Sequence, residues 1–306
     1  MWNLSFTAPE VIEARVLTRL PDAFRRKRRT EWSDANKPGH EVDSFLEGPS
    51  FDRDGNLFVT DIPFGRIFRI SPALAWTLVA EYDGWPNGMA FHRDGSLWIT
   101  DYRRGLLRHP GTGAAPDVLL GHRNSESFKG VNDLTFDFEG NCYFTDQGQT
   151  GLHDPSGRVY RLRADGRLDL LIDGIPSPNG VALDAAGKFI FVAVTRANQV
   201  WRGPLLADGS VSKIGAFRTF FGTSGPDGMA VDADNRVVVA HASLGGAFVC
   251  NAKGEVTYFV KSPAGSTVTN VAYRPGTSTL VMTESETGAI LEAQLPAKGA
   301  PLYSHY

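Results

Sequence analysis

The chain has 306 residues, 42% of them hydrophobic, so it can bury a large core in one large domain or two average ones. Its formal net charge of −3 gives no bulk electrostatic support for a nucleic-acid or anionic-membrane partner. No apolar run approaches the ~20 residues needed to cross a bilayer, and the N-terminus lacks the pattern of a signal peptide. The only two cysteines, Cys142 and Cys250, lie in separate apolar runs and are expected to be buried free thiols, which is typical of a cytoplasmic protein.

The first 46 residues carry no repeat. Residues 11–20 alternate loosely between polar and apolar side chains and predict one strand. A run of five basic residues follows at 25–29. We interpret this run as a solvated loop rather than as a site for an anionic partner.

From residue 47 onward the chain is periodic. Residues 51–61, 91–101 and 136–146 each predict a strand, a tight turn with glycine, and a second strand, and looser copies begin at Leu183, Val231 and Tyr273. A third strand follows every hairpin, and a fourth follows in five of the six units. Four strands in a unit of 40–50 residues are typical of a propeller blade.

A recurring signature fixes the number of blades. Ser177-Pro178-Asn179-Gly180 and its counterparts place one oxygen-bearing side chain just before the innermost strand of each unit. These residues follow one another at intervals of 40, 45, 47, 48 and 43: Glu47, Asn87, Asn132, Asn179, Asp227 and Asn270. The sequence therefore predicts an all-β fold, a six-bladed β-propeller of four-stranded antiparallel blades around a central channel, as one domain over residues 1–306. The sixth blade lacks an outer strand, which we expect the N-terminal segment, residues 1–46, to supply as a ring-closing strand.

The innermost strands of a propeller line its channel, so these six residues are expected to gather at one mouth. Their side chains are hard oxygen donors with only two formal negative charges, which favours Ca²⁺ or Mg²⁺, with Mn²⁺ and Fe²⁺ as alternatives. Asn-Gly and Asp-Gly are also turn formers, and Asn87 and Asn270 are equally well explained as turn residues. Glu47 is a poor turn former, so we interpret it as a ligand.

Four of these motifs resemble one known family. Glu47-Gly48-Pro49, Val131-Asn132-Asp133, Ser177-Pro178-Asn179-Gly180 and Gly225-Pro226-Asp227-Gly228 are similar to motifs of the gluconolactonase/regucalcin (senescence marker protein) family. That family includes the Drp-type lactonases of staphylococci and is related to diisopropyl fluorophosphatase. The likeness extends from about residue 45 to about residue 295.

The resemblance implies a catalytic divalent cation on the propeller axis and the hydrolysis of sugar lactones or related cyclic esters. Glu47, Asn179 and Asp227 match the shared metal ligands, and Asn132 matches a position that binds the metal in some members and the substrate in others. Ca²⁺ is the expected cofactor, with Mg²⁺, Mn²⁺, Fe²⁺ or Zn²⁺ as alternatives. The cation would polarise the lactone carbonyl, and Asp227 would act as the general base towards water or as a nucleophile.

Substrate contacts are expected from residues beside the ring. The second strands should end at the same mouth, where a recurring Thr-Asp pair is interpreted as structural. Sugar-binding members carry an arginine where this chain has Gly130, a departure that favours a more apolar or larger substrate. The substrate-binding candidates are Asn87, Lys129, Asp146, His241 and Asn270.

Other functions remain open at this point. The same site could hydrolyse a phosphotriester or another ester, and a propeller can also bind a ligand or a protein without catalysis. A metal-free condensing enzyme of the strictosidine synthase type needs no such ring, so the ring counts against it. The expected partner is a small-molecule lactone or ester, and the oligomeric state is left open.

Overall fold

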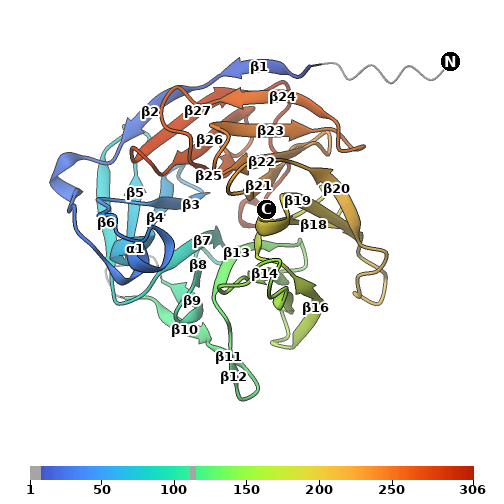
Figure 1. Ribbon diagram of the computed structural model, residues 1–306. Helices are drawn as coiled ribbons and strands as arrows, with labels where there is room; N and C mark the ends of the chain where they lie inside the picture. The colour runs from blue at the N-terminus through green and yellow to red at the C-terminus, as the bar shows by residue number, and fades with distance from the viewer. Residues whose placement is uncertain (1–7, 111–114) are drawn as a thin grey trace.

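The computed structural model describes residues 8–110 and 115–306. Six antiparallel sheets radiate from a central axis, and in each of them the first strand lies nearest the axis (Figure 1). This arrangement confirms the predicted six-bladed β-propeller of four-stranded blades.

The first three blades follow one another along the chain. Blade 1 contains β3 (Leu46–Phe51), β4 (Leu57–Asp61), β5 (Arg66–Ile70) and β6 (Trp76–Glu81). Blade 2 contains β7 (Pro86–Phe91), β8 (Leu97–Asp101), β9 (Gly105–His109) and β10 (Asp117–Leu120). Blade 3 contains β13 (Val131–Phe136), β14 (Cys142–Asp146), β15 (Gly157–Leu162) and β16 (Leu168–Ile175). A small hairpin of β11 (His122–Arg123) and β12 (Glu126–Ser127) lies between blades 2 and 3 in sequence.

The last three blades complete the ring. Blade 4 contains β17 (Pro178–Leu183), β18 (Phe189–Val194), β19 (Gln199–Pro204) and β20 (Gly215–Thr219). Blade 5 contains β21 (Pro226–Val231), β22 (Val237–His241), β23 (Gly246–Cys250) and β24 (Val256–Lys261). Blade 6 contains β25 (Val268–Tyr273), β26 (Thr279–Glu284) and β27 (Ala289–Gln294).

The N-terminal segment supplies the outermost strands of two blades. β2 (Arg15–Arg19) pairs antiparallel with β27 and gives blade 6 its fourth strand. β1 (Glu10–Glu13) pairs in parallel with β24 and adds a fifth strand to blade 5. The sequence predicts one strand over this stretch, and the structure divides it at Ala14, whose side chain is buried and whose N–H donates to Lys261 O at 3.0 Å.

The core lies between neighbouring blades, where the apolar faces of adjacent sheets pack together. Cys142 and Cys250 are both buried and free, as the sequence predicts. Short helices are confined to the connections: η1 (Asp22–Phe24), α1 (Glu31–Asn36), η2 (Ile62–Phe64), η3 (Thr195–Ala197) and η4 (Tyr303–His305). None of the helices in the described ranges is long and apolar enough to cross a membrane.

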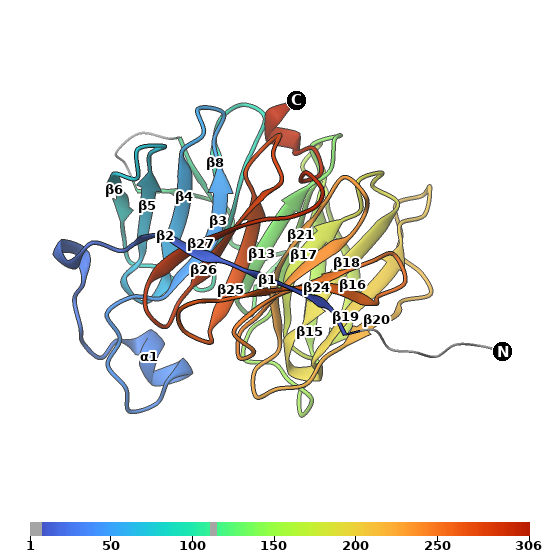
Figure 2. The same ribbon diagram turned by 90° about the horizontal axis from the view of Figure 1, so that it is seen from above.

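The two mouths of the channel are covered differently. Figure 2 shows α1 and the C-terminus at opposite ends of the propeller axis. At the C-terminal mouth, Ala300 N donates to Val231 O of blade 5 at 3.0 Å, and Arg53 of blade 1 donates to Ser304 O at 2.7 Å. The inner strands begin at the other mouth, beside α1, and the expected functional residues lie there.

Candidate functional site

Five of the predicted axial residues occupy one repeated position. Glu47, Asn87, Asn132, Asn179 and Asp227 are each the second residue of an inner strand, rather than the residue before it as the sequence suggests. The pairing of the inner strand with its neighbour is irregular at this point in every blade, for example between Glu47 and Ser50 and between Pro226 and Met229. Such bulges turn a side chain out of the regular alternation of a strand.

The glycine after the axial residue allows the inner strands to approach one another closely. A Cβ atom on Gly48 would lie 2.3 Å from Asn87 O on the next blade, and one on Gly180 would lie 2.3 Å from Asp227 O. No side chain fits at these distances. In these blades the glycine of the repeated signature is therefore required by the packing of one inner strand on the next.

Blade 6 keeps this register but carries a different type of residue at the ring position. Val268 pairs with Glu284 as Leu46 pairs with Asp61, so the position equivalent to Glu47 is Thr269. Asn270 is one residue further along the strand. The prediction that Asn270 is the sixth axial residue is therefore wrong by one position. A signal was present in the sequence, because each of the other axial residues lies four positions before the apolar end of its strand whereas Asn270 lies only three positions before Tyr273.

The recurring threonine fixes the axial residues from the neighbouring blade. Thr60 Oγ1 donates to Asn87 O at 2.9 Å, and Thr145 Oγ1 donates to Asn179 O at 2.7 Å. Thr100 Oγ1 makes the same contact with Asn132 O. The structural interpretation of the threonine in the Thr-Asp pairs is confirmed.

Second partners orient several of the ring side chains. Asn270 Nδ2 donates to Glu47 Oε2 at 2.8 Å, and Gly48 N donates to the same oxygen. Asn132 Nδ2 donates to Gln147 Oε1 at 2.8 Å, which leaves Asn132 Oδ1 as the amide atom available for a ligand. The side chains of Asn179 and Asp227 line the same cavity beside them.

Three carboxyl groups lie close together under this mouth. Burial raises the pKa of Glu47 and, together with the charges of Glu47 and Asp133, raises that of Asp227 well above its usual value. Burial also raises the pKa of Asp133, the residue after Asn132, to about 7. The protein alone therefore does not compensate the charge of these groups.

The ring opens into a cavity of about 260 Å³ on the α1 side. Of the predicted residues, Glu47, Asn87, Asn132, Asn179 and Asp227 line it. Asn87 is thus the one substrate-binding candidate that the structure brings to this cavity.

The other four substrate-binding candidates lie elsewhere. Lys129 is exposed outside the cavity, and Asn270 lies behind Glu47. Asp146 is buried and accepts a hydrogen bond from Gly130 N at 2.9 Å. His241 is buried against Phe220 and Phe248 in the space between blades.

Several cavity residues were missed by the sequence reasoning. They come from the non-repetitive N-terminal segment and from the ends and connections of the strands, where no periodicity marks them. Their side chains add aromatic and cationic groups to the wall: Trp32, Asn36, Lys37, Phe45, Trp85, Tyr102, Gln147 and Arg196.

The donor set fits a hard divalent cation. Two carboxylates and up to three amide oxygens converge on one cavity, and oxygen ligands of this kind are preferred by Ca²⁺. The raised pKa values of Glu47 and Asp227 point the same way, because a cation would compensate their charge. No group of three or more His, Cys, Asp and Glu residues suited to a metal occurs in the described ranges, so a metal here would depend on the asparagine amides.

A larger cavity, about 560 Å³, opens towards the C-terminal mouth. It is lined by the far ends of the inner strands, such as Phe51, Phe91 and Tyr273, and by Tyr303. Glu47 and Asp227 do not line it. The smaller cavity is therefore the candidate functional site.

Comparison with known proteins identifies the family. The protein-family model described as the SMP-30/Gluconolactonase/LRE-like region matches residues 45–286 of this chain. Lactonase drp35 of Staphylococcus epidermidis is 29% identical over 254 residues, covering 78% of this chain and 77% of that protein. A gluconolactonase from Xanthomonas campestris has a similar fold, with a TM-score of 0.75 at 20% identity over 92% of this chain and 99% of the other. Regucalcin of Agrobacterium tumefaciens, described as a calcium-binding protein, gives a TM-score of 0.74 at 20% identity over 97% and 99% of the two chains. The chain belongs to the SMP-30/gluconolactonase/LRE-like family.

Proposed function

We propose that the protein is a metal-dependent lactonase, a carboxylic ester hydrolase that opens a small cyclic ester. The observation that carries the proposal is the ring itself, in which two buried carboxylates and three amides face one cavity. The names of the staphylococcal relatives and of the gluconolactonase with the same fold support the reaction class. The calcium-binding neighbour supports Ca²⁺ as the cation.

Glu47, Asn132, Asn179 and Asp227 would hold the cation through side-chain oxygens. A divalent cation bound there supplies a Lewis acid that polarises the lactone carbonyl and stabilises the developing oxyanion. Asn270 and Gln147 keep Glu47 and Asn132 oriented through the hydrogen bonds described above. Outer partners of this kind commonly set ligand orientation in metal sites.

Asp227 is the group we assign as general base. Its carboxyl group lines the cavity and is one of the two formal charges of the ring. In this role Asp227 accepts a proton from the attacking water and returns it to the alkoxide oxygen formed when the C–O bond of the lactone ring breaks, so the product is the open-chain hydroxy acid. Two buried free cysteines support a cytoplasmic setting for this reaction.

Chelation tests the proposal directly. Hydrolysis of a panel of γ- and δ-lactones should disappear with EDTA and return when Ca²⁺ is added back. Asp227→Asn and Glu47→Gln should each lower kcat/KM by about 10²–10⁴-fold. Asp208→Asn and Glu255→Gln, which change exposed carboxylates outside the cavity, serve as controls and should leave activity unchanged.

The result that would overturn the mechanism is hydrolysis that survives both EDTA and Asp227→Asn. Cleavage of phosphotriesters or open-chain esters in place of lactones would assign a different substrate to the same ring. Tight binding of Ca²⁺ without turnover of any ester would identify a non-catalytic binding propeller.

A further inference from the structure

A segment outside the repeat forms part of the wall of the cavity. Residues 20–45, here called the cap segment, run from the end of β2 to the start of β3 and include η1 and α1. Thr30 and Ser33 form a reciprocal capping box that begins α1. Trp32 from α1 packs with Ile62 and Phe64 of blade 1, so the helix is fixed against the mouth.

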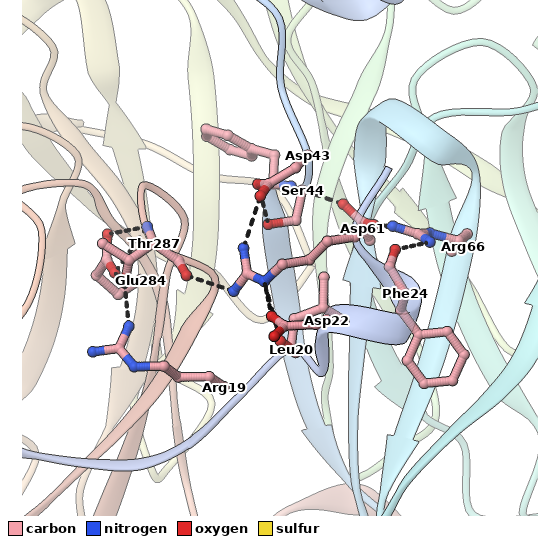
Figure 3. A network of polar contacts seen from close by, with 12 residues as sticks. Arg19, Leu20, Asp22, Phe24, Asp43, Ser44, Asp61, Arg66, Glu284 and Thr287 are labelled. Carbon is pink, nitrogen blue, oxygen red and sulfur yellow. Dashed lines mark hydrogen bonds and ion pairs between the residues drawn. The ribbon is translucent and has the colours of Figure 1, made fainter. Parts of the chain in front are cut away.

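Polar contacts hold the cap segment to blades 1 and 6 (Figure 3). Arg66 of β5 is completely buried, pairs with Asp61, and donates to Phe24 O at 2.6 Å. Arg25 donates to Asp43 Oδ2 at 3.0 Å and to Thr287 O of blade 6 at 2.8 Å. Arg25 therefore serves a structural role, which corrects the interpretation of residues 25–29 as a solvated loop at this position.

The cap segment places Lys37 in the wall of the cavity. Its Nζ atom lies 5.0 Å from the centre of the Phe45 ring, and burial lowers its pKa. The charges of Glu284 and Glu286 partly oppose this lowering of the pKa, yet among the described residues neither forms an ion pair with Lys37. Glu284 accepts from Thr287 and Glu286 accepts from Ser266, so both are already engaged.

Arg196 brings a second cation to the same cavity from blade 4. It belongs to η3, which directly follows β18. Its side chain is exposed and lines the same cavity as Asp227 and Tyr102. Within the part of the chain that the structure describes, Arg196 makes no ion pair, so its guanidinium is available to a ligand.

These two cations change the charge of the occupied site. A divalent cation would neutralise Glu47 and Asp227, and the wall would then carry Lys37 and Arg196 in excess. Cations that lack a protein partner in a half-buried cavity attract and orient an anionic ligand. Trp32 with Phe45, and Trp85 with Tyr102, form two aromatic pairs beside them, with ring centres 4.6 and 6.0 Å apart.

We propose that the preferred substrate is a lactone carrying an anionic group, held by Lys37 and Arg196 against the aromatic wall. This inference rests on the proposed function for the reaction, but its recognition step does not depend on turnover. Neither cation is part of the ring, so each would bind the substituent while the ring acts on the ester.

A matched pair of substrates tests the inference. γ-Butyrolactone with a carboxylate on its γ-carbon should be opened with a kcat/KM at least about tenfold higher than γ-valerolactone, which has a methyl group there. Lys37→Met and Arg196→Met should each lower kcat/KM for the carboxylate by about tenfold and leave the neutral lactone within about twofold. Added salt should raise KM for the carboxylate alone.

Binding provides a readout that needs no catalysis. Pyroglutamate is the lactam that matches the carboxylate lactone, and calorimetry in the presence of Ca²⁺ should detect it binding more tightly than pyroglutamide, its neutral amide. Lys37→Met and Arg196→Met should weaken pyroglutamate alone. Lys253→Met and Arg69→Met, at exposed positions away from the cavity, are the controls and should have no effect.

The outcomes separate the two proposals. Selective binding of pyroglutamate without hydrolysis of either lactone would contradict the proposed lactonase activity and support the proposed anion site. Equal kcat/KM for both lactones, unchanged by either variant, would overturn the anion site and keep the lactonase. The Lys37→Met and Arg196→Met variants could also relieve product inhibition while leaving the ratio of kcat/KM for the two lactones unchanged. That result would overturn the anion site for the substrate, because the two cations would then bind the acid that is released as product.

Discussion

Asn270 lies just behind the ring and positions one of its two charged members. Its amide donates to Glu47 Oε2 at 2.8 Å, and its own Oδ1 accepts from Val271 N at 2.8 Å. Both amide atoms are therefore committed to protein partners. This residue is better described as a positioning residue than as the substrate contact that the sequence suggests.

Asn270→Ala should weaken Ca²⁺ binding by about 10–100-fold, because Glu47 would lose the donor that fixes its orientation. Calorimetric titration of the chelator-treated protein measures this effect without turnover. Asn141→Ala removes a turn amide bonded to Asp137 and is the matched control, which should bind Ca²⁺ normally. Normal affinity in Asn270→Ala would show that the hydrogen bond to Glu47 has no role in the metal site.

The buried carboxyl groups predict how pH and the cation are coupled. In the metal-free protein the pKa of Asp133 is raised by burial from 3.8 to about 7, and those of Glu47 and Asp227 are raised as well. Between the ordinary and the raised pKa values the folded state binds more protons than the unfolded state. The free energy of unfolding of the metal-free protein should therefore fall as pH rises from about 4 to about 7.

A bound cation should reverse this loss, since it favours the ionised carboxylates. The increase in Tm produced by Ca²⁺ should be small near pH 5 and larger near pH 8, as measured by thermal melting with Ca²⁺ and with EDTA. In Glu47→Gln the increase should be smaller at every pH. A gain in Tm that is the same at pH 5 and pH 8 would contradict a site built on these groups.

At the scale of the element, the hairpin that starts each blade both builds the sheet and fixes its neighbour. Thr145 is the second-last residue of β14, the second strand of blade 3, and its hydroxyl donates to Asn179 O on blade 4 at 2.7 Å. Thr145→Val keeps the shape of the side chain, leaves this buried carbonyl without that donor, and also removes the hydroxyl that accepts from Asp133 N at 3.0 Å. The free energy of unfolding in urea should fall by about 1–3 kcal/mol.

Thr145→Ser keeps the hydroxyl and should recover most of the stability, which separates the hydrogen bond from packing. Because the carbonyl belongs to Asn179, Thr145→Val should also weaken Ca²⁺ binding more than Thr279→Val, a change on blade 6 remote from the ring. Unchanged stability in Thr145→Val would show that the contact between blades contributes nothing.

The repeated elements explain why the fold could be predicted from the sequence and part of the site could not. Asn179 and Asp227 recur with a turn, a glycine and a strand, so their blade and their place on the axis follow from local chemistry. Asn270 was misassigned because blade 6 carries Thr269 at the ring position and an asparagine directly after it, so a search for amide and carboxylate side chains selects the wrong residue. Lys37 and Arg196 lie in connections outside the repeated strands, so no local pattern marks them. They come to one cavity only because the ring of blades closes.

At the scale of the whole molecule, residues near the two ends of the chain hold the ring together. β2 completes blade 6 and β1 extends blade 5, so the N-terminal segment bridges the last two blades from outside (Figures 1 and 2). The C-terminal segment crosses the far mouth, where Tyr303 contacts His92 of blade 2. β2 covers the edge of β27, so the outer edge of blade 6 is formed by a strand from the N-terminal segment.

Deletion of residues 1–20 should expose the edges of β27 and β24 and remove the anchor of the cap segment. We expect a lower Tm and concentration-dependent association, because unpaired edge strands pair with other chains. Thermal melting and light scattering measure the two effects. Deletion of residues 1–7 leaves β1 and β2 intact and is the matched control. The two deletion variants could instead have the same Tm and the same monodispersity. In that case the contacts between blades hold the ring by themselves, and β2 adds a strand to a propeller that is already closed.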